Sequence, residues 1–191
     1  MQPNPSSSAM PISLLPTESS SVRNSDEAFR QYFEPVWRNL RRLGVRVDLV
    51  DDACQDVFLI VHRRWGEHAN CELRTWIFGI SVRVASEYRR RKQPKADHVP
   101  IVEQATAASA APDRQVEFRQ ASDQLQALLD QLKPHEREVF TAVELEQMTV
   151  PEVAQALNVN LNTAYTRLRA ARARFEELLR NESRLDEVNH G

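Results

Sequence analysis

The chain has 191 residues, with 25 basic and 27 acidic side chains and a formal net charge of −2. This length accommodates one domain or two small ones. No apolar run is long enough to span a bilayer, and the first residues lack the basic start and apolar core of a signal peptide. We therefore expect a cytoplasmic protein.

Charge is separated by sign along the chain. Acidic residues cluster between Asp48 and Asp56, whereas basic residues cluster at 83–95 and 167–174. A protein that binds duplex DNA strongly on its own usually has a net basic surface. The composition therefore predicts that any DNA contact is assisted by a partner, which the acidic segment could engage.

The sequence has no pattern typical of a catalytic or metal site. The spacing of Cys54 and Cys71 fits neither a disulfide framework nor a metal site, and Cys54 lies in a helical apolar pattern. The five histidines are scattered, and no Ser, Cys or carboxylate has a base partner at a motif spacing. We expect no enzyme activity, no metal and no cofactor.

Helices are expected from the start of the ordered chain. Residues 1–24 are rich in Ser and Pro, which predicts a flexible tail. A helical apolar pattern begins at Asp26, and Pro35 should kink that helix or begin a second one. Asp48 can cap the next helix, which should run to about Trp65.

One face of this next helix is acidic and polar, and it consists of Asp51, Asp52, Gln55 and Asp56. Carboxylates in a first turn stabilise a helix through its dipole, which alone could explain Asp51. Asp56 lies two turns into the helix, where the dipole explains less. A binding role for this face therefore stays open beside the purely structural one.

The stretch from Leu73 to Lys92 combines an apolar stripe with a basic end. The stripe consists of Leu73, Trp76, Ile77, Ile80, Val84 and Tyr88, and the basic residues are Arg74, Arg83, Arg89, Arg90, Arg91 and Lys92. Aromatic rings beside a basic track suit single-stranded nucleic acid, because bases stack on rings and phosphates need counter-charge. The alternatives are a core role for Trp76 and a dipole role for the basic end.

A linker divides the chain into two helical modules. From Gln93 to about Phe118 the sequence is rich in Pro, Ala and Ser and has too few apolar residues to pack a core. We expect an all-α fold of two small domains joined by a flexible linker. Their bounds are 25–93 and 122–180, with the linker at 94–121 and a second tail at 181–191.

The second module carries a helix-turn-helix pattern. Thr149-Val150-Pro151-Glu152 is a capping box with Pro in the first turn, and Asn158-Val159-Asn160 predicts a tight turn before a helix from Leu161 to about Leu179. A short helix, a three-residue turn and a longer basic helix form the arrangement that places its second helix in the major groove of DNA. A helical hairpin that contacts protein has the same geometry and is the alternative.

Periodicity separates the two faces of the long helix. Ala164, Leu168 and Ala171 turn inward, and the outward residues are Asn162, Thr163, Tyr165, Thr166, Arg167, Arg169 and Ala170. Asn160 and Thr163 lie near the helix start, where phosphate contact is favoured. Tyr165, Thr166 and Arg169 are the better candidates for reading bases, since Arg can bridge two acceptors on guanine.

Together the two modules resemble a bacterial RNA polymerase sigma factor of the extracytoplasmic-function (ECF) group, which keeps only regions 2 and 4. The resemblance covers about 26–92 and 122–179. It rests on four segments in order, which are VDDACQDVF at 50–58, LRTWIFGISVRVA at 73–85, LKPHEREVF at 132–140 and MTVPEVAQALNVNLNTAYTRLRAARARF at 148–175. In the family, the first binds core polymerase, the second melts the promoter, and the last two form region 4.

This resemblance implies an initiation factor, monomeric when free, that brings core polymerase to promoter DNA under the control of an anti-sigma factor, often membrane-tethered. The residues implied to dock on the clamp helices of the largest polymerase subunit are Asp52, Gln55 and Asp56. Those implied to bind the −10 element, together with the loop 66–72, are Arg74, Trp76, Arg83, Arg89, Arg90 and Arg91. Those implied to read the −35 element are Asn160, Asn162, Thr163, Tyr165, Thr166, Arg167 and Arg169.

The chain departs from the family pattern in four places. Gly79 stands where Arg is frequent, Arg83 where Asn is common, Leu161-Asn162 where Glu-Gly is usual, and Tyr165 where a basic residue is common.

Two rival functions stay open. One is an autonomous helix-turn-helix repressor with an N-terminal sensory module, which would bind DNA without polymerase. The other is a protein that only sequesters polymerase.

Overall fold

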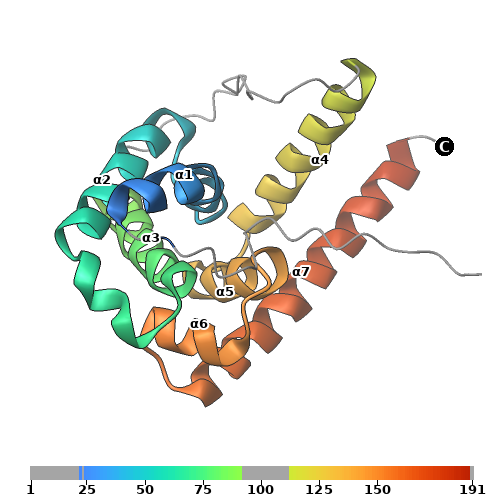
Figure 1. The fold of residues 1–191 in the computed structure, drawn as a ribbon. Helices are drawn as coiled ribbons and strands as arrows, with labels where there is room; N and C mark the ends of the chain where they lie inside the picture. The colour runs from blue at the N-terminus through green and yellow to red at the C-terminus, as the bar shows by residue number, and fades with distance from the viewer. Residues whose placement is uncertain (1–21, 23, 92–111, 190–191) are drawn as a thin grey trace, which may run out of the picture.

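The computed structural model describes residue 22 and residues 24–91 and 112–189, and every regular element among them is helical (Figure 1). This confirms the predicted all-α fold. In the described part of the chain, no helix is both long and apolar enough to cross a membrane. Most of the expected N-terminal tail and the linker residues 94–111 lie outside the described residues.

Helix α1 (Ser25–Arg42) begins at a satisfied N-cap. The side chain of Asn24 accepts hydrogen bonds from two backbone N–H groups, those of Asp26 and Glu27, at 3.1 and 2.9 Å. The helix continues through the buried Pro35, so the expected second helix does not begin there. It ends just before Gly44, whose φ of +89° explains glycine at this position.

Helix α2 (Val50–Arg63) is preceded by a 3-10 turn, η1 (Val47–Leu49), and followed by a short 3-10 helix, η2 (Trp65–Asn70). The prediction that Asp48 caps α2 is wrong. Its carboxylate instead accepts two hydrogen bonds from the guanidinium of Arg46, at 3.0 and 2.8 Å, and α2 begins with no side-chain cap. The expected loop 66–72 is largely the helix η2.

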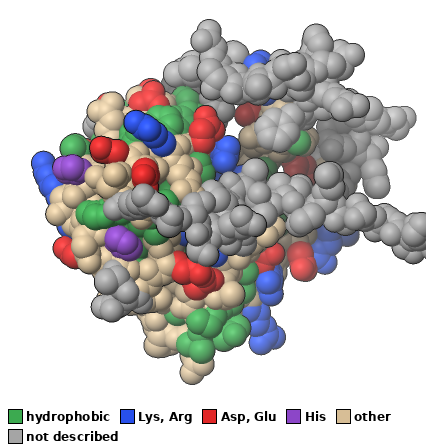
Figure 2. Space-filling view, in the orientation of Figure 1, with side chains coloured by type: hydrophobic (Ala, Val, Ile, Leu, Met, Phe, Trp, Pro, Cys, Tyr) green, Lys and Arg blue, Asp and Glu red, His purple; other side chains and the backbone are tan. Residues whose placement is uncertain are grey.

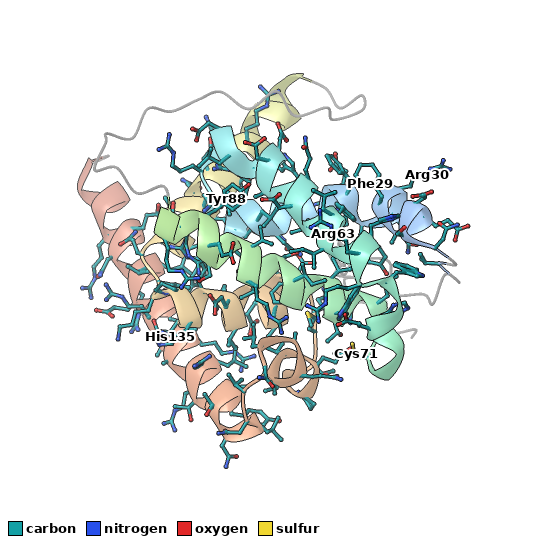
Figure 3. All side chains as sticks on the ribbon, turned by 90° about the vertical axis from the view of Figure 1, so that its left-hand side faces the viewer. Phe29, Arg30, Arg63, Cys71, Tyr88 and His135 are labelled. Atoms are coloured by element: carbon teal, nitrogen blue, oxygen red, sulfur yellow. The ribbon has the colours of Figure 1, made fainter. Side chains whose placement is uncertain are left out.

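Helix α3 (Leu73–Arg91) lies at the centre of the fold. It packs against α1, α2 and α6, and Figures 1 and 3 show it between α2 and the helices of the second module. Its burial extends beyond the predicted apolar stripe to Thr75, Phe78, Ser81 and Val82. A helix buried on several sides needs packing from more than one direction. Both modules supply it here.

The second module contains α4 (Pro112–Asp130), α5 (Pro134–Phe140), the π-helical turn η3 (Thr141–Leu145), α6 (Val150–Leu157) and α7 (Leu161–Asn189). Helix α4 begins ahead of the expected start near Ser122, inside the stretch assigned to the linker. Helix α7 runs past its expected end at Leu179, into the stretch assigned to the second tail, and no Gly or Pro lies within it to stop it.

The helix expected over 135–147 is divided by η3. The backbone N–H of Glu146 bonds to the carbonyl of Thr141, five residues earlier, at 3.0 Å. Gln147 then takes a positive φ of 54°, which ends the segment and turns the chain toward α6. Glu146 is thereby buried, with 3% of its surface exposed, although it lies next to an exposed turn.

The two modules share one hydrophobic core. Apolar side chains of α1, α2 and α3 form a single buried cluster with Val139, Ala142, Met148, Val153, Ala156 and Leu168 of the second module. A smaller cluster, made of Leu128, Leu129, Leu132, Phe140, Ala171 and Leu178, joins α4, α5 and α7. Segments expected as separate domains are therefore packed against each other in this structure.

Candidate functional site

The acidic face of α2 is exposed to solvent. Asp52, Gln55 and Asp56 are all exposed, whereas Cys54 on the opposite face is fully buried. Asp56 accepts a hydrogen bond at 2.8 Å from the hydroxyl of Tyr88 on α3. Asp51 accepts one at 2.9 Å from the indole Nε1 of Trp37 on α1. These two hydrogen bonds anchor the edges of the face, and its carboxylates remain available to a partner.

Sequence reasoning missed an apolar residue on this same face. Leu59 lies one helical turn after Gln55 and Asp56, and half of its surface is exposed. Nearby on α1, Phe29 is 43% exposed, and its ring packs on those of Phe33 and Phe58 with centroids 5.2 and 4.9 Å away. Figure 3 labels Phe29 on α1 and Arg63 at the end of α2. The helical spacing of Leu59 from Gln55 and Asp56 could have placed it on this face from the sequence alone.

The basic residues of α3 fall into two groups. Arg83 and Arg90 are exposed. Arg74 and Arg89 are mostly covered, because each forms an ion pair with a carboxylate of the second module: Glu152 at 3.5 Å and Glu138 at 3.0 Å. The guanidinium of Arg89 also donates to the backbone carbonyl of Leu43. The side chain of Arg91 lies outside the described residues.

Aromatic rings gather where η2 meets the start of α3. The centroids of Trp65 and His68 are 4.8 Å apart, and those of His68 and Trp76 are 5.5 Å apart. Trp76 is partly buried. Part of its ring packs in the core, and the rest is exposed. Trp65 and His68 were not predicted as site residues. Both are aromatic, and they lie next to and within the loop 66–72, which was predicted to bind the −10 element.

The helix-turn-helix forms as predicted. Thr149 and Glu152 make the capping box, in which the backbone N–H of Thr149 donates to Glu152 at 2.6 Å. Asn158 adopts the left-handed conformation, with φ 53° and ψ 50°. The side chain of Asn160 then accepts a hydrogen bond at 2.7 Å from the backbone N–H of Thr163, which caps α7. These local contacts orient α6 and α7.

The predicted faces of α7 are confirmed by its burial. Ala164, Leu168 and Ala171 are buried. The exposed residues are Asn160, Asn162, Tyr165, Thr166, Arg169 and Ala170, and Thr163 and Arg167 are partly exposed. Figure 2 shows basic side chains along the lower right of the molecule, over α7. An open groove of about 500 Å³ at the start of α7 is lined by Asn160, Leu161, Asn162, Thr163, Thr166 and Arg167.

Two large apolar side chains are exposed in the first turns of this helix. Leu161 is 43% exposed and Tyr165 is 52% exposed. They lie four residues apart and so share one face of α7. Further along the helix, Arg172 and Arg174 are paired with Glu144 and Glu177, both at 2.7 Å, so Arg169 is the more available cation.

The described residues include no cluster of His, Cys, Asp or Glu that could hold a metal ion. The thiol of Cys54 has its pKa raised to about 12, because burial and the nearby Asp51 disfavour its ionised form. A thiol of this kind is a poor nucleophile.

Two family models together match more than half of the chain. Residues 28–95 match "Sigma-70 region 2" and residues 122–175 match "Sigma-70, region 4". Over 160 residues, the chain is 27% identical to the ECF RNA polymerase sigma factor SigM of Mycobacterium tuberculosis, in both the Erdman and the H37Rv strain. That alignment covers 81% of this chain and 76% of SigM.

Two solved structures share the fold, each at 19% sequence identity. CnrH in complex with the cytosolic domain of CnrY matches with a TM-score of 0.62 and covers 82% of this chain and 88% of its own. The sigma factor RpoE in complex with the anti-sigma factor NepR, from Bartonella quintana, matches with a TM-score of 0.61 and covers 81% and 96%.

Proposed function

Because the chain belongs to the ECF RNA polymerase sigma factors, with sigma-70 regions 2 and 4, we propose that it binds core RNA polymerase and directs it to a particular set of promoters. Members of this family are not enzymes. In this proposal region 2 melts the −10 element and region 4 reads the −35 element. The chain acts in the cytoplasm, where polymerase and template are.

The observation that carries the proposal is the exposure of two oppositely charged surfaces on different helices. The acidic face of α2 presents Asp52, Gln55 and Asp56, and α7 presents Arg169 beside polar side chains. The acidic face suits the basic clamp helices of the largest polymerase subunit, because complementary charge steers association. Leu59 adds a desolvated apolar contact at the same face. The basic face of α7 suits duplex DNA.

At the −35 element, the start of α7 enters the major groove. Asn160, Asn162 and Thr163 contact phosphates at the helix start, where backbone N–H groups and the helix dipole favour anions. Tyr165, Thr166 and Arg169 face the base edges, with Arg167 beside them. Phosphate contacts set the position of the helix, and the base contacts set the sequence that is read.

At the −10 element, one base is held out of the stack. Extruding a base costs a few kcal/mol, which stacking and hydrogen bonding in a pocket must offset. The rings of Trp65, His68 and Trp76 lie together beside the start of α3 and supply stacking surfaces. The arginines at 74, 83, 89, 90 and 91 supply charge for the backbone of the separated strand.

The proposed function includes control by an anti-sigma factor. In one of the two similar structures CnrH is in complex with the cytosolic domain of CnrY, and in the other the sigma factor RpoE is in complex with the anti-sigma factor NepR. We propose that a protein of this class binds the present chain and keeps it from polymerase. The free chain is a monomer.

Transcription in vitro tests the function. Purified chain, core polymerase and a library of genomic fragments should yield transcripts from a small set of fragments, whereas core alone should not. In gel shifts, these fragments should be bound poorly by the chain alone and tightly once core is added. Tight binding without core would indicate the autonomous repressor instead. Competition for core with no transcripts would indicate a sequestering protein.

A further inference from the structure

Helices α1 and α2 of region 2 lie side by side and run in opposite directions (Figure 1). Four contacts show the direction, since residue numbers rise along α1 as they fall along α2. These contacts are Ser25–His62, Phe29–Phe58, Phe33–Cys54 and Trp37–Asp51. The end of α2 therefore lies beside the first turn of α1, where the N-terminal segment enters the fold.

Apolar side chains are exposed along this helix pair. In the described part of region 2, the exposed large apolar side chains are Phe29 and Leu59. Phe33 is partly exposed, and the rings of Phe29 and Phe33 pack on Phe58 with centroid distances of 4.9 and 6.4 Å. We call Phe29, Phe33 and Leu59 the apolar strip. Exposed apolar side chains that are grouped mark a contact surface more often than isolated ones do.

The N-terminal segment contains apolar residues of its own. Residues 10–16 read MPISLLP, and their larger apolar side chains are Met10, Ile12, Leu14 and Leu15. Runs of serine lie on both sides, and segments that stay unfolded are usually poor in aliphatic residues of this kind. We call residues 10–16 the apolar motif. It lies outside the described residues.

The apolar strip is within reach of this motif. Val22 is partly buried against the core that includes α1 and α2, so the chain already follows region 2 before α1 begins. Leu15 lies seven residues before Val22, which allows a span of up to about 24 Å in an extended chain. Phe29 lies about one turn beyond Ser25, and Leu59 lies about one turn before the partner of Ser25 on α2.

We propose that residues 10–16 bind the apolar strip of α1 and α2 within the same chain, and that this contact competes with core polymerase for Leu59. Docking stands on the strip and on the position of the motif, whereas the competition rests on the function proposed above. Charge favours the same placement. Glu18 is the only charged side chain in residues 1–21, and the exposed Arg63 lies one turn beyond Leu59 on the same side of α2.

A tethered motif of this kind needs only weak affinity. A short tether gives an effective concentration on the order of 1 mM, so a contact with a dissociation constant near that value is occupied in about half of the molecules. Polymerase binds the fraction of molecules in which the strip is uncovered, so its apparent dissociation constant rises by the inverse of that fraction. The motif therefore weakens core binding and is displaced when core is abundant.

Paramagnetic broadening in the full chain tests docking without polymerase or promoter. A nitroxide is attached to Ser13→Cys in a Cys71→Ser background, in which the remaining Cys54 is buried and should stay unlabelled. In a chain with ¹³C-labelled leucine methyl groups, the signals of Leu59 should be broadened strongly. The signals of Leu161, on α7, should be broadened much less.

The control for this test keeps the tether and removes the apolar side chains. It carries Ile12→Ser, Leu14→Ser and Leu15→Ser in the same labelled chain, and the broadening at Leu59 should fall severalfold. Equal broadening with and without the apolar side chains would overturn the docking. Broadening that appears when the nitroxide and the ¹³C label are on different chains would show that the segment of a second copy binds, and would also overturn it.

Affinity for immobilised core polymerase tests the competition. The same triple serine variant, without labels, should bind core severalfold more tightly than the unchanged chain. Ser6→Asn, Ser7→Asn and Ser8→Asn together change as many residues outside the motif and should leave the affinity unchanged. Equal affinity of the triple serine variant and the unchanged chain would overturn the competition. If no variant binds core, the proposed function fails and the competition with it, while the nitroxide result still decides the docking.

Discussion

Arg42 and Glu146 form a buried ion pair that joins the first helix to the turn before the helix-turn-helix. The Nη1 atom of Arg42 lies 2.7 Å from Oε1 of Glu146, and their side chains are 14% and 2% exposed. Burial lowers the pKa of Arg42 and raises that of Glu146, and their mutual attraction opposes both shifts. Such a pair is costly to break from one side, because the remaining charge stays buried.

Arg42→Met should destabilise the protein by about 3–5 kcal/mol at pH 8, since it leaves the carboxylate of Glu146 buried without its partner. Because the pKa of Glu146 is raised in the folded chain, folding is favoured when this group is protonated. The loss should therefore shrink as the pH falls toward the raised pKa. Urea unfolding at pH 8 and pH 5.5 measures both effects.

Arg46→Met provides the comparison for that experiment. Arg46 pairs with Asp48 at 2.8 Å, but the two side chains are 55% and 38% exposed. Its removal should cost less than about 1 kcal/mol, because solvent screens exposed pairs. If the two variants lose equal stability, burial does not explain the contribution of the Arg42–Glu146 pair to the free energy of unfolding.

Asp52→Ala combined with Asp56→Ala should abolish binding to core polymerase and leave the fold intact, because both carboxylates are exposed. Affinity capture on immobilised core measures the first effect, and circular dichroism the second. Asp26→Ala combined with Asp123→Ala removes the same charge from exposed positions outside α2. Tyr88→Phe removes the hydroxyl that donates to Asp56 and keeps both carboxylates of this face. Normal binding by the α2 variant would show that polymerase docks on another surface.

Cys54 should resist thiol reagents in the folded chain, whereas the partly exposed Cys71 should react. The pKa of Cys54 is raised from 9.0 to about 12, so its reactive thiolate is scarce below that pH. By linkage, the stability from this neutral thiol is fully present below pH 9 and is lost as the pH rises toward 12. Titration with a chromogenic disulfide should give one fast thiol, and the second only in denaturant. Two fast thiols would contradict the burial.

Features set by neighbouring residues could be read from the sequence. The capping box at Thr149 and Glu152, the left-handed Asn158 and the cap at Asn160 each depend on contacts within a few residues. The inward face of α7 follows from periodicity alone. The resemblance to a family, carried by four ordered segments, then identified the function class.

Features set by distant contacts could not be read in this way. Asp48 had the right position for a cap, but a bidentate contact with Arg46 competed for its carboxylate. The π-helical turn buries the carboxylate of Glu146, and this burial is tolerated because Arg42, distant in sequence, forms an ion pair with it. Gly79 looked like a departure from the family pattern, and its reason is the backbone of Ala156, far away in sequence. Burial on the second side of α3 depends on its packing against α6.

Arg169→Glu should weaken binding to the duplex −35 element by about 1–3 kcal/mol and relax specificity at one base pair, if its guanidinium bridges two acceptors on guanine. Fluorescence anisotropy with fragments selected by transcription measures the affinity, in the presence of core. Arg180→Glu, also exposed on α7 but three turns further on, is the matched control. Equal losses in both variants would indicate general electrostatic attraction and no base contact by Arg169.

The exposed Leu161 and Tyr165 should read thymine. Both side chains are exposed on the side of α7 that we propose faces DNA, and the C5-methyl group of thymine is the apolar feature of the major groove. Replacing each thymine of the −35 element by deoxyuridine removes only that methyl group. Binding should weaken at one or two positions, as measured by anisotropy in the presence of core.

Leu161→Ala and Tyr165→Ala should each abolish this discrimination at one position, so that the variant binds thymine and deoxyuridine fragments equally. A variant that merely damages α7 would weaken binding to both fragments and keep their ratio. Ala170→Ser, at another exposed position of the helix, should leave the ratio unchanged. If the wild-type chain binds both fragments equally at every position, these two side chains do not touch thymine methyl groups. Another binding partner would then have to account for the exposure of two apolar side chains.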